Sequence, residues 1–229
     1  MPRLIKLFFF PCAFLMMTPP SPVYAQADPK KSSHMADQNT AQESQSSYKV
    51  SFDGFSKNFP KVRPSSGAPV EIVYVNFRDD HELVIAAAHA IAKKIPLGTE
   101  LIVILGDQAN GLGVLVATQA KLPWIIIKNK EGIEGVSKKI AYSSITSGSK
   151  KMFLSPLQLE AIKGKKVVIM DDVISTGSTV KAAASLIGDS VQKILGFMCV
   201  FTEEVQHTEI NGIPVTSLGH LPVFPLKRA

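Results

Sequence analysis

Two adjacent acids and a run of small hydroxyl residues stand together in the segment KKVVIMDDVISTGSTVKAA, at residues 165–183. Four apolar residues lead into Asp171 and Asp172, and a short loop follows before an alanine-rich stretch begins. Carboxylates repel phosphate, whereas a loop of small hydroxyl residues and glycine tends to bind it. The segment therefore calls for a ligand that carries both a phosphate and a group that an acid can hold. The loop residues are Ser175, Thr176, Gly177, Ser178 and Thr179.

The elements around this loop give it the geometry of an anion site. The apolar run 167–170 predicts a strand that ends at the acids, and residues 178–188 place apolar side chains on one face of a helix that stops at Gly188. A helix N-terminus carries unpaired N–H groups and a partial positive charge. Gly177 lets the backbone approach the anion closely, so a larger residue there is expected to fill the room for phosphate. The loop lacks the lysine and the length of a Walker A loop, which favours a single phosphate monoester.

The acids require a second group on the same ligand. Vicinal ribose hydroxyls donate hydrogen bonds to carboxylates, and a Mg²⁺ ion can bridge acid and hydroxyl oxygens. Ribose 5-phosphate carries both the hydroxyls and the phosphate. On the residues alone three other interpretations stay open: a Walker B strand, a phospho-acceptor site, and a loop that does no more than cap a helix.

The rest of the chain predicts an α/β fold. Short apolar runs alternate with helical patterns of ordinary length, which indicates an open, mainly parallel sheet covered by helices on both faces. Residues 128–155 break the alternation and form an excursion from the sheet with two weak strand patterns, 141–146 and 151–155. The predicted strands are 101–106, 124–128, 167–170, 193–201 and 213–218, and the predicted helices are 83–95, 111–121 and 178–188.

The N-terminal region reads as a leader. Two cations precede an apolar run at residues 7–17, and the small residues before Gln26 suit a secretory cleavage site. We therefore expect a signal peptide at 1–25, a disordered polar linker at 26–47, a domain at 48–229, and export to the periplasm or medium with no membrane span left after cleavage. A start at Met35 would instead give a cytoplasmic protein. Cys12 lies in the leader, and Cys199 is expected to be buried.

The signature VVIMDDVISTGST resembles the PRPP-binding motif of the type I phosphoribosyltransferases: apolar residues, two acids, then a T-G-x-T loop. Three further segments resemble the purine, adenine-phosphoribosyltransferase-like branch: GDQANGLGVLVATQAKLPWIIIK, YSSITSGSKKMFLSPLQLEAIKGKK and VTSLGHLPVF. The resemblance covers roughly residues 79–225. It implies the type I fold, which adds a flexible loop and a small C-terminal hood to the open sheet, and a homodimer stays open.

The resemblance also implies roles. Asp171 and Asp172 would hold the ribose hydroxyls of PRPP as the catalytic pair, and residues 175–179 would hold its 5-phosphate. Mg²⁺ would arrive with PRPP, near Asp171, without a protein-only metal site. The loop 129–139 would close over the reaction. The pyrophosphate would meet Gln108, Ala109, Asn110, Gly111 and Lys128. The base would meet Leu221, Pro222, Val223 and Phe224, with Trp124 and Phe77 as weaker candidates, and core packing explains residues 221–224, Trp124 and Phe77 each equally well.

Several residues depart from the family pattern. Gln108 and Asn110 are neutral where relatives often carry an acid and a cation, and Lys128 is followed by Asn129 where a basic pair is common, with Lys130 able to compensate. Fewer charges would weaken the hold on pyrophosphate. Glu131 and Glu134 are candidates for a general acid, although solvated charges on a loop are the simpler interpretation. The five histidines show no metal spacing.

Two functions follow from these patterns. The first is Mg²⁺-dependent transfer of phosphoribosyl from PRPP to a purine base, adenine favoured, with hypoxanthine, guanine and xanthine open. The second is a PRPP-binding or sensing protein that keeps the fold without the reaction. The net charge of +6 decides little between ligand classes. No helix-turn-helix pattern precedes the domain, so we expect no nucleic-acid partner.

Overall fold

The structure is a computed structural model that describes residues 46–64, 67–106, 108–144 and 148–226. All of them belong to one compact unit, Gln42–Ala229. The predicted signal peptide and all but the last two residues of the predicted linker lie outside the described residues. The first strand begins at Ser47. Within the described ranges, no helix is both long and apolar enough to cross a membrane.

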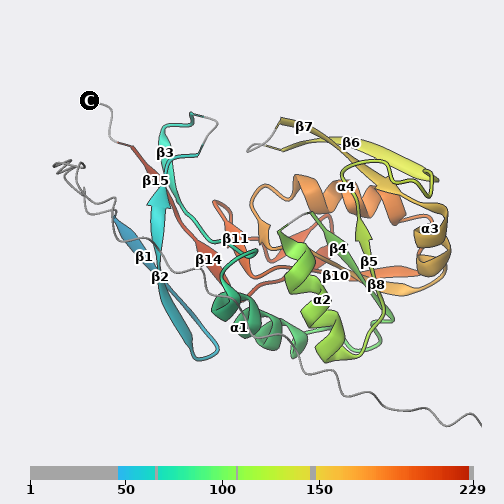
Figure 1. Cartoon of the computed structure of the whole chain (residues 1–229), viewed down its shortest axis with the longest axis horizontal. Coiled ribbons are helices and arrows are strands. Elements are labelled where there is room, and N and C mark those ends of the chain that lie inside the picture. Colours follow the sequence, from blue (N-terminus) through green and yellow to red (C-terminus); the bar gives the residue numbers. More distant parts are fainter. Residues whose placement is uncertain (1–45, 65–66, 107, 145–147, 227–229) are drawn as a thin grey trace, which may run out of the picture. The chain divides into compact units, whose positions relative to one another are not determined.

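The centre of the unit is a six-stranded sheet (Figure 1). Its strands are parallel except for the short edge strand β12. The two central strands β4 and β8 are apolar along almost their whole length, as expected for strands covered on both faces. The prediction of an open, mainly parallel sheet is confirmed. The strands, in spatial order, are β12 (Glu209–Ile210), β13 (Ile213–Thr216), β10 (Lys193–Met198), β8 (Lys166–Met170), β4 (Leu101–Leu105) and β5 (Trp124–Ile127).

Helices cover both faces of this sheet, as predicted. Side chains of β4 alternate between two buried clusters, with Ile102 and Ile104 on one face and Val103 and Leu105 on the other. The first cluster contains the buried faces of α1 (His81–Ala92) and α2 (Ala109–Ala120), and the second contains those of α3 (Pro156–Ile162) and α4 (Ser178–Ile187). Local sequence fixes two helix starts. Asp80 caps α1 by accepting from Leu83 N, and Ser155 and Gln158 form a capping box at α3.

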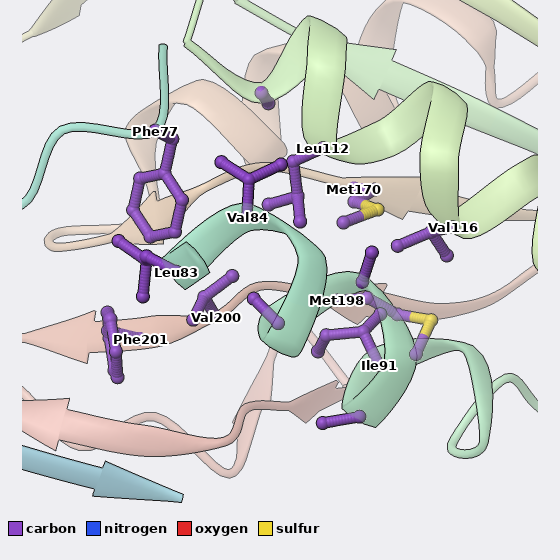
Figure 2. Packing of buried hydrophobic residues seen from close by; sticks show 14 of the residues in the cluster. Phe77, Leu83, Val84, Ile91, Leu112, Val116, Met170, Met198, Val200 and Phe201 are labelled. Carbon is purple, nitrogen blue, oxygen red and sulfur yellow. The ribbon is translucent and has the colours of Figure 1, made fainter. Parts of the chain in front are cut away.

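Figure 2 shows the packing on the α1 side of the sheet. Phe77, just before α1, points toward Leu83 and Val84 of the helix, and its ring centroid lies 6.2 Å from that of Phe201. Phe77 is 2% exposed and Phe201 1%. Burial of several large side chains here stabilises the fold by about 1.5–3 kcal/mol each. Cys199 is also fully buried, as predicted.

Three strands of the sheet continue past its carboxyl edge as a second, smaller parallel sheet. Its order β14–β11–β9 matches the order β13–β10–β8 of the strands that precede it. The backbone N–H of Asp171 donates to Met198 O at 2.9 Å, whereas Asp172 O accepts from Val200 N at 2.9 Å. The ladder is therefore interrupted beside the two acids. The strands are β9 (Val173–Ile174), β11 (Phe201–Glu203) and β14 (Gly219–Leu221).

This interruption corrects one prediction. The apolar segment 193–201 was expected to form a single strand, but β10 ends at Met198 and β11 begins at Phe201, in another sheet. The apolar pattern continues across the break because Cys199 and Val200 are also fully buried. Hydrophobicity alone therefore carries no sign of the change in hydrogen-bonding partners.

Two further sheets stand outside the central one. An antiparallel hairpin, β6 (Lys138–Ser144) and β7 (Gly148–Leu154), occupies the predicted excursion and lies along α4 (Figure 1). An antiparallel sheet of order β1–β2–β3–β15 contains β15 (Val223–Pro225), which comes from the C-terminal stretch where a small hood was expected. Its other three strands come from the N-terminal part of the domain, where the sequence patterns had not been assigned. These are β1 (Ser47–Phe52), β2 (Phe55–Val62) and β3 (Val70–Val73).

Candidate functional site

A cavity of about 500 Å³ opens at the carboxyl edge of the central sheet. One wall is the continuous segment 171–180, which contains both acids and the whole predicted phosphate loop. Gly106 and Gln108, after β4, line the cavity beside it. Residues of the β6–β7 hairpin and of the β3–β15 sheet form the remaining walls. Ligands of open α/β sheets bind at this edge, so the fold places the candidate residues where a ligand is expected.

The two acids differ in exposure. Asp171 is 7% exposed, and its Oδ1 accepts a hydrogen bond from Asp172 N at 3.0 Å. Burial raises the pKa of Asp171 well above its usual range, the charge of Asp172 raises it further, and the positive charge of Lys150 acts in the opposite direction. Asp172 is only partly buried and lines the same cavity. Asp172 is thus the more accessible acceptor for a ligand hydroxyl.

The phosphate loop ends in an open helix N-terminus. Gly177, the residue before α4, has φ +75°, and Lys181 N donates to its carbonyl oxygen at 3.0 Å. No side chain caps α4, and its first turn contains no acid. The hydroxyls of Thr176 and Ser178 lie 3.4 Å apart. An N-terminus without its own cap and with hydroxyl donors beside it is suited to an external anion.

The segment after β11 packs behind the loop. A Cβ added at Gly177 would lie 2.7 Å from Cδ1 of Ile210 in β12. His207 Nε2 lies 2.6 Å from the carbonyl oxygen of Ser175, and it donates there because a carbonyl can only accept. The reason for requiring glycine at 177 is therefore different from the one expected. A larger side chain would meet Ile210 and a left-handed backbone, rather than fill the space of a phosphate.

The predicted pyrophosphate turn reaches the cavity at one residue. Gln108 lines the cavity, whereas Ala109 begins α2 and is fully buried, and Gly111 is exposed. Asn110 Oδ1 is buried and has no hydrogen-bond partner among the described residues. The structure thus brings only Gln108 of these four next to the acids.

Lys128, the predicted cation of the pyrophosphate site, does not line the cavity and has another partner. Its ammonium group forms an ion pair with Glu134, and this hydrogen bond lowers the pKa of Glu134. A carboxyl group with a lowered pKa is a poor proton donor at neutral pH, which argues against Glu134 as a general acid. The predicted loop 129–139 also ends earlier than expected, because Lys138 and Lys139 belong to β6. Asn129 does line the cavity.

The base-pocket candidates separate into two groups. Val223 lines the cavity, together with Pro64, Ala68, Val70 and Ile72 from the connection before β3 and from β3 itself. These five side chains give an aliphatic wall. The other candidates do not line the cavity. Leu221 and Phe77 are core residues, Pro222 is partly buried, and Phe224 packs against Tyr48 and Lys61. Trp124 is exposed at the amino end of β5, whereas the cavity lies at the carboxyl edge of the sheet.

Five polar or charged cavity residues carry no prediction from the sequence: Arg78, Tyr142, Lys150, Glu203 and Glu204. Glu203 has a recognisable pattern in the sequence. Like Asp171, it stands at the end of an apolar strand and is followed by a second acid. Burial raises the pKa of Glu203, and the charges of Glu204 and Asp172 raise it further. Arg78, Tyr142 and Lys150 carry no local signal, since only the tertiary arrangement brings them to the cavity.

A phosphoribosyl transferase domain model matches residues 74–218, which is more than half of the chain. An orotate phosphoribosyltransferase of Streptococcus pyogenes serotype M12 (strain MGAS2096) is 28% identical over 127 residues, 53% of each chain. An adenine phosphoribosyltransferase of Mesomycoplasma hyopneumoniae (strain 7448) is 32% identical over 130 residues, 53% of this chain and 74% of the relative.

A solved structure of a phosphoribosyltransferase shares the fold of this chain. The crystal structure of an adenine phosphoribosyltransferase from Thermoanaerobacter pseudethanolicus superposes with a TM-score of 0.59 at 15% identity, over 71% of this chain and 95% of that one. The chain spans about half the length of the orotate relative that it matches. The extent of the family match and the shared fold lead to one assignment: the chain belongs to the phosphoribosyl transferase domain family.

Proposed function

We propose that the chain transfers a phosphoribosyl group from PRPP to a purine base, with adenine favoured, and releases pyrophosphate. The observation that carries the proposal is the single cavity in which two acids at an interrupted strand edge adjoin an uncapped helix N-terminus. A sugar phosphate matches both features at once. The aliphatic wall beside them suits the flat, largely apolar faces of a nucleobase.

Different residues of the cavity bind different parts of PRPP. Asp172, with the buried Asp171 behind it, accepts hydrogen bonds from the ribose hydroxyls, and the start of α4 binds the 5-phosphate. A base nitrogen attacks the anomeric carbon and loses its proton to solvent, while the bond from that carbon to pyrophosphate breaks and its electron pair leaves with pyrophosphate. Catalysis then depends on positioning and on neutralising the leaving group.

Mg²⁺ is the expected cofactor. The oxygen donors of Asp171 and Asp172 are of the type that Mg²⁺ prefers, and among the described residues no group of three or more acidic, His or Cys side chains could hold a metal by itself. These two acids would hold the ion together with PRPP. When bound, Mg²⁺ supplies positive charge to the phosphate oxygens.

The preference for adenine is supported by relatives rather than by a base contact. Both the M. hyopneumoniae relative and the T. pseudethanolicus structure are named adenine phosphoribosyltransferases, whereas the S. pyogenes relative is named for orotate. Glu203 and Asp172 make the cavity acidic on one side, which disfavours the orotate carboxylate. A donor-bearing base such as adenine fits this side better.

The test is pyrophosphate release from PRPP and Mg²⁺ with a panel of adenine, hypoxanthine, guanine, xanthine and orotate. We expect turnover with adenine, and loss of that turnover in the Asp171→Asn/Asp172→Asn variant. Turnover with orotate alone would overturn the purine assignment. Absence of turnover with every base, alongside measurable PRPP binding, would overturn the enzyme proposal.

A second candidate function is a PRPP-binding protein without turnover. Two observations favour it. Lys128, a cation expected to bind the leaving group, is paired with Glu134, and Gln108 in the cavity is neutral. The two candidates share the ribose and 5-phosphate contacts and differ in pyrophosphate release. Calorimetric PRPP binding combined with the base panel separates them.

We also propose that the protein is exported after cleavage before Gln26. The support is the cationic, apolar and small-residue layout of residues 1–25 in the sequence. Mass analysis of the N-terminus in fractions of the native host tests this directly. A chain that begins at Gln26 in the periplasm or medium supports export, and a chain that begins at Met35 in the cytoplasm contradicts it.

A further inference from the structure

The cavity needs a source of positive charge that the sequence patterns had not identified. Lys128, the expected one, is engaged by Glu134. Arg78 and Lys150 are the cationic side chains that line the cavity within the described part of the chain. Of these, Lys150 forms no salt bridge with any described residue, and its charge acts on the carboxyl group of Asp171. The ammonium group of Lys150 can therefore bind an anion that enters the cavity.

The strand register explains why Lys150 reaches the cavity. Lys150 lies directly opposite Tyr142 in the β6–β7 hairpin, and Tyr142 also lines the cavity. The next residue on the same face of β7 is Met152, which is 1% exposed in the cluster shared with α4. Because side chains alternate along a strand, Lys150 continues the face that packs on the sheet and α4.

The neighbouring lysine faces the other way. Lys151 lies opposite Ala141, and both residues are exposed, whereas Lys150 and Tyr142 are partly buried. Lys150 and Lys151 thus have the same charge, the same length and adjacent positions, but different surroundings. The pair is a natural matched comparison for a role inside the cavity.

The position of the hairpin relative to α4 defines what Lys150 faces. The hairpin lies along α4, whose first two residues, Ser178 and Thr179, are the last two of the phosphate loop (Figure 1). Both Lys150 and the loop residues 175–179 line the same cavity. An anion bound at the start of α4, or a second phosphate beside it, therefore has the helix N-terminus on one side and an ammonium group available on another.

We propose that Lys150 is a phosphate-binding residue of this cavity, which contributes from the β6–β7 hairpin the positive charge that Lys128 does not supply. The inference rests on the proposed function, since the phosphate belongs to PRPP or to its products. Two groups have this chemistry, the 5-phosphate and the pyrophosphate. A charge-assisted hydrogen bond between an ammonium and a phosphate oxygen is among the stronger contacts that a protein makes.

The experiment measures binding of three probes, PRPP with Mg²⁺, ribose 5-phosphate, and inorganic pyrophosphate with Mg²⁺, by calorimetry at two salt concentrations. Lys150→Ala and Lys150→Gln are compared with wild type and with the control Lys151→Ala. We expect the Lys150 variants to weaken PRPP binding about 10- to 100-fold. Their affinity should also depend less on salt than that of wild type, because one screened charge is removed. Lys151→Ala should remain within about twofold of wild type.

The probes separate the outcomes. Weaker binding of ribose 5-phosphate assigns Lys150 to the 5-phosphate, and weaker binding of pyrophosphate assigns it to the leaving group. Wild-type affinities for all three probes in Lys150→Ala, or equal losses in Lys151→Ala, would overturn the inference while the proposed function stands. If wild type binds none of the probes, the proposed function fails and the inference fails with it. Unchanged melting temperatures show that the Lys150 variants are folded.

Discussion

The two sides of the cavity differ in how the chain builds them. One side is a single run of ten residues, 171–180, in which a strand edge, a loop and a helix start follow one another. The opposite side is assembled from separate segments: the connection before β3, the β6–β7 hairpin and β15. The first side depends on local geometry, and the second depends on how distant segments pack. We expect substitutions on the two sides to have different signatures.

The largest effect is expected on the continuous side, at the acid pair. Replacing both Asp171 and Asp172 with Asn removes the accessible charged acceptor for the ribose hydroxyls together with the buried carboxyl group behind it, and each charge-assisted hydrogen bond lost has a net contribution of about 1.5–3 kcal/mol. We therefore expect kcat/KM for PRPP to fall at least about 100-fold, as measured by pyrophosphate release. Glu160→Gln is the control, because Glu160 is exposed and its ion pair is with Lys163, the residue that follows α3. Near-normal turnover in the double variant would place the ribose elsewhere.

The second effect separates backbone strain from packing in the phosphate loop. Gly177→Val places a β-branched residue at φ +75° and its Cβ 2.7 Å from Ile210 Cδ1. We expect unfolding to be easier by about 2 kcal/mol or more, and PRPP binding to weaken about 10-fold as the loop shifts.

Gly54→Val is the matched control for this variant. Gly54 has φ +84° and nothing within 4 Å of its added Cβ, so the substitution carries strain without the clash. Denaturant unfolding and calorimetry of both variants isolate the contribution of Ile210. Equal destabilisation in the two variants, with unchanged PRPP affinity, would show that Ile210 does not support the loop.

The third effect concerns stability rather than binding. The pKa of Asp171 is raised by burial, so the folded protein binds this proton more tightly than the unfolded chain. The wild-type protein therefore loses stability as the pH rises from about 4, near the unfolded pKa, until the pH passes the raised pKa of the folded state. Asp171→Asn removes this loss, and its amide oxygen can still accept from Asp172 N. We expect a higher melting temperature at pH 7, by roughly 2–4 °C for each kcal/mol, and a smaller difference near pH 4.

Asp189→Asn serves as the comparison, because the contribution of Asp189 to stability changes with pH in the opposite direction. The hydrogen bond from Lys138 lowers the pKa of Asp189, so its contribution is present at neutral pH and is lost as the pH falls. Because Asp189 is exposed, the effect should be small. A melting temperature that falls in Asp171→Asn at pH 7 would show that the buried carboxyl group stabilises the fold.

The same contrast explains what the sequence could predict. The strands and helices around β4, β8 and α4 follow from apolar runs and helical spacing, and the acids and loop are neighbours in the chain. Residues such as Lys150 and Ile72 reach the cavity only through strand pairing across many residues. In the sheet β1–β2–β3–β15, β1 alternates exposed residues with the buried Val50 and Phe52, which is a signal that the sequence offers, whereas β2 and β3 contain mostly partly buried residues and alternate less clearly.

Two features of the structure are hidden from the sequence for a shared physical reason. The sequence leaves a base pocket and core packing equally open for Phe77 and Leu221, because an aromatic or aliphatic residue near a motif has the same composition whether it lines a cavity or fills a core. Phe77 and Leu221 are buried by packing around Phe201 and α1, which only the tertiary structure reveals. The β10–β11 break was missed because buried residues continue through it. Glu203 shows that an acid at the end of an apolar strand indicates a cavity residue at a second place besides Asp171.

The smallest effect is expected at Lys128, which lies outside the cavity lining. Lys128→Ala breaks a surface ion pair with Glu134, and exposed pairs of this kind contribute little to stability. Since Lys128 does not line the cavity, the KM for PRPP should change less than about threefold, far less than the change expected for Lys150→Ala. Steady-state kinetics of the two variants under one set of conditions make the comparison. A large rise in KM for Lys128→Ala would mean that Lys128 leaves Glu134 to contact the substrate, and the hairpin would then share its role with the preceding loop.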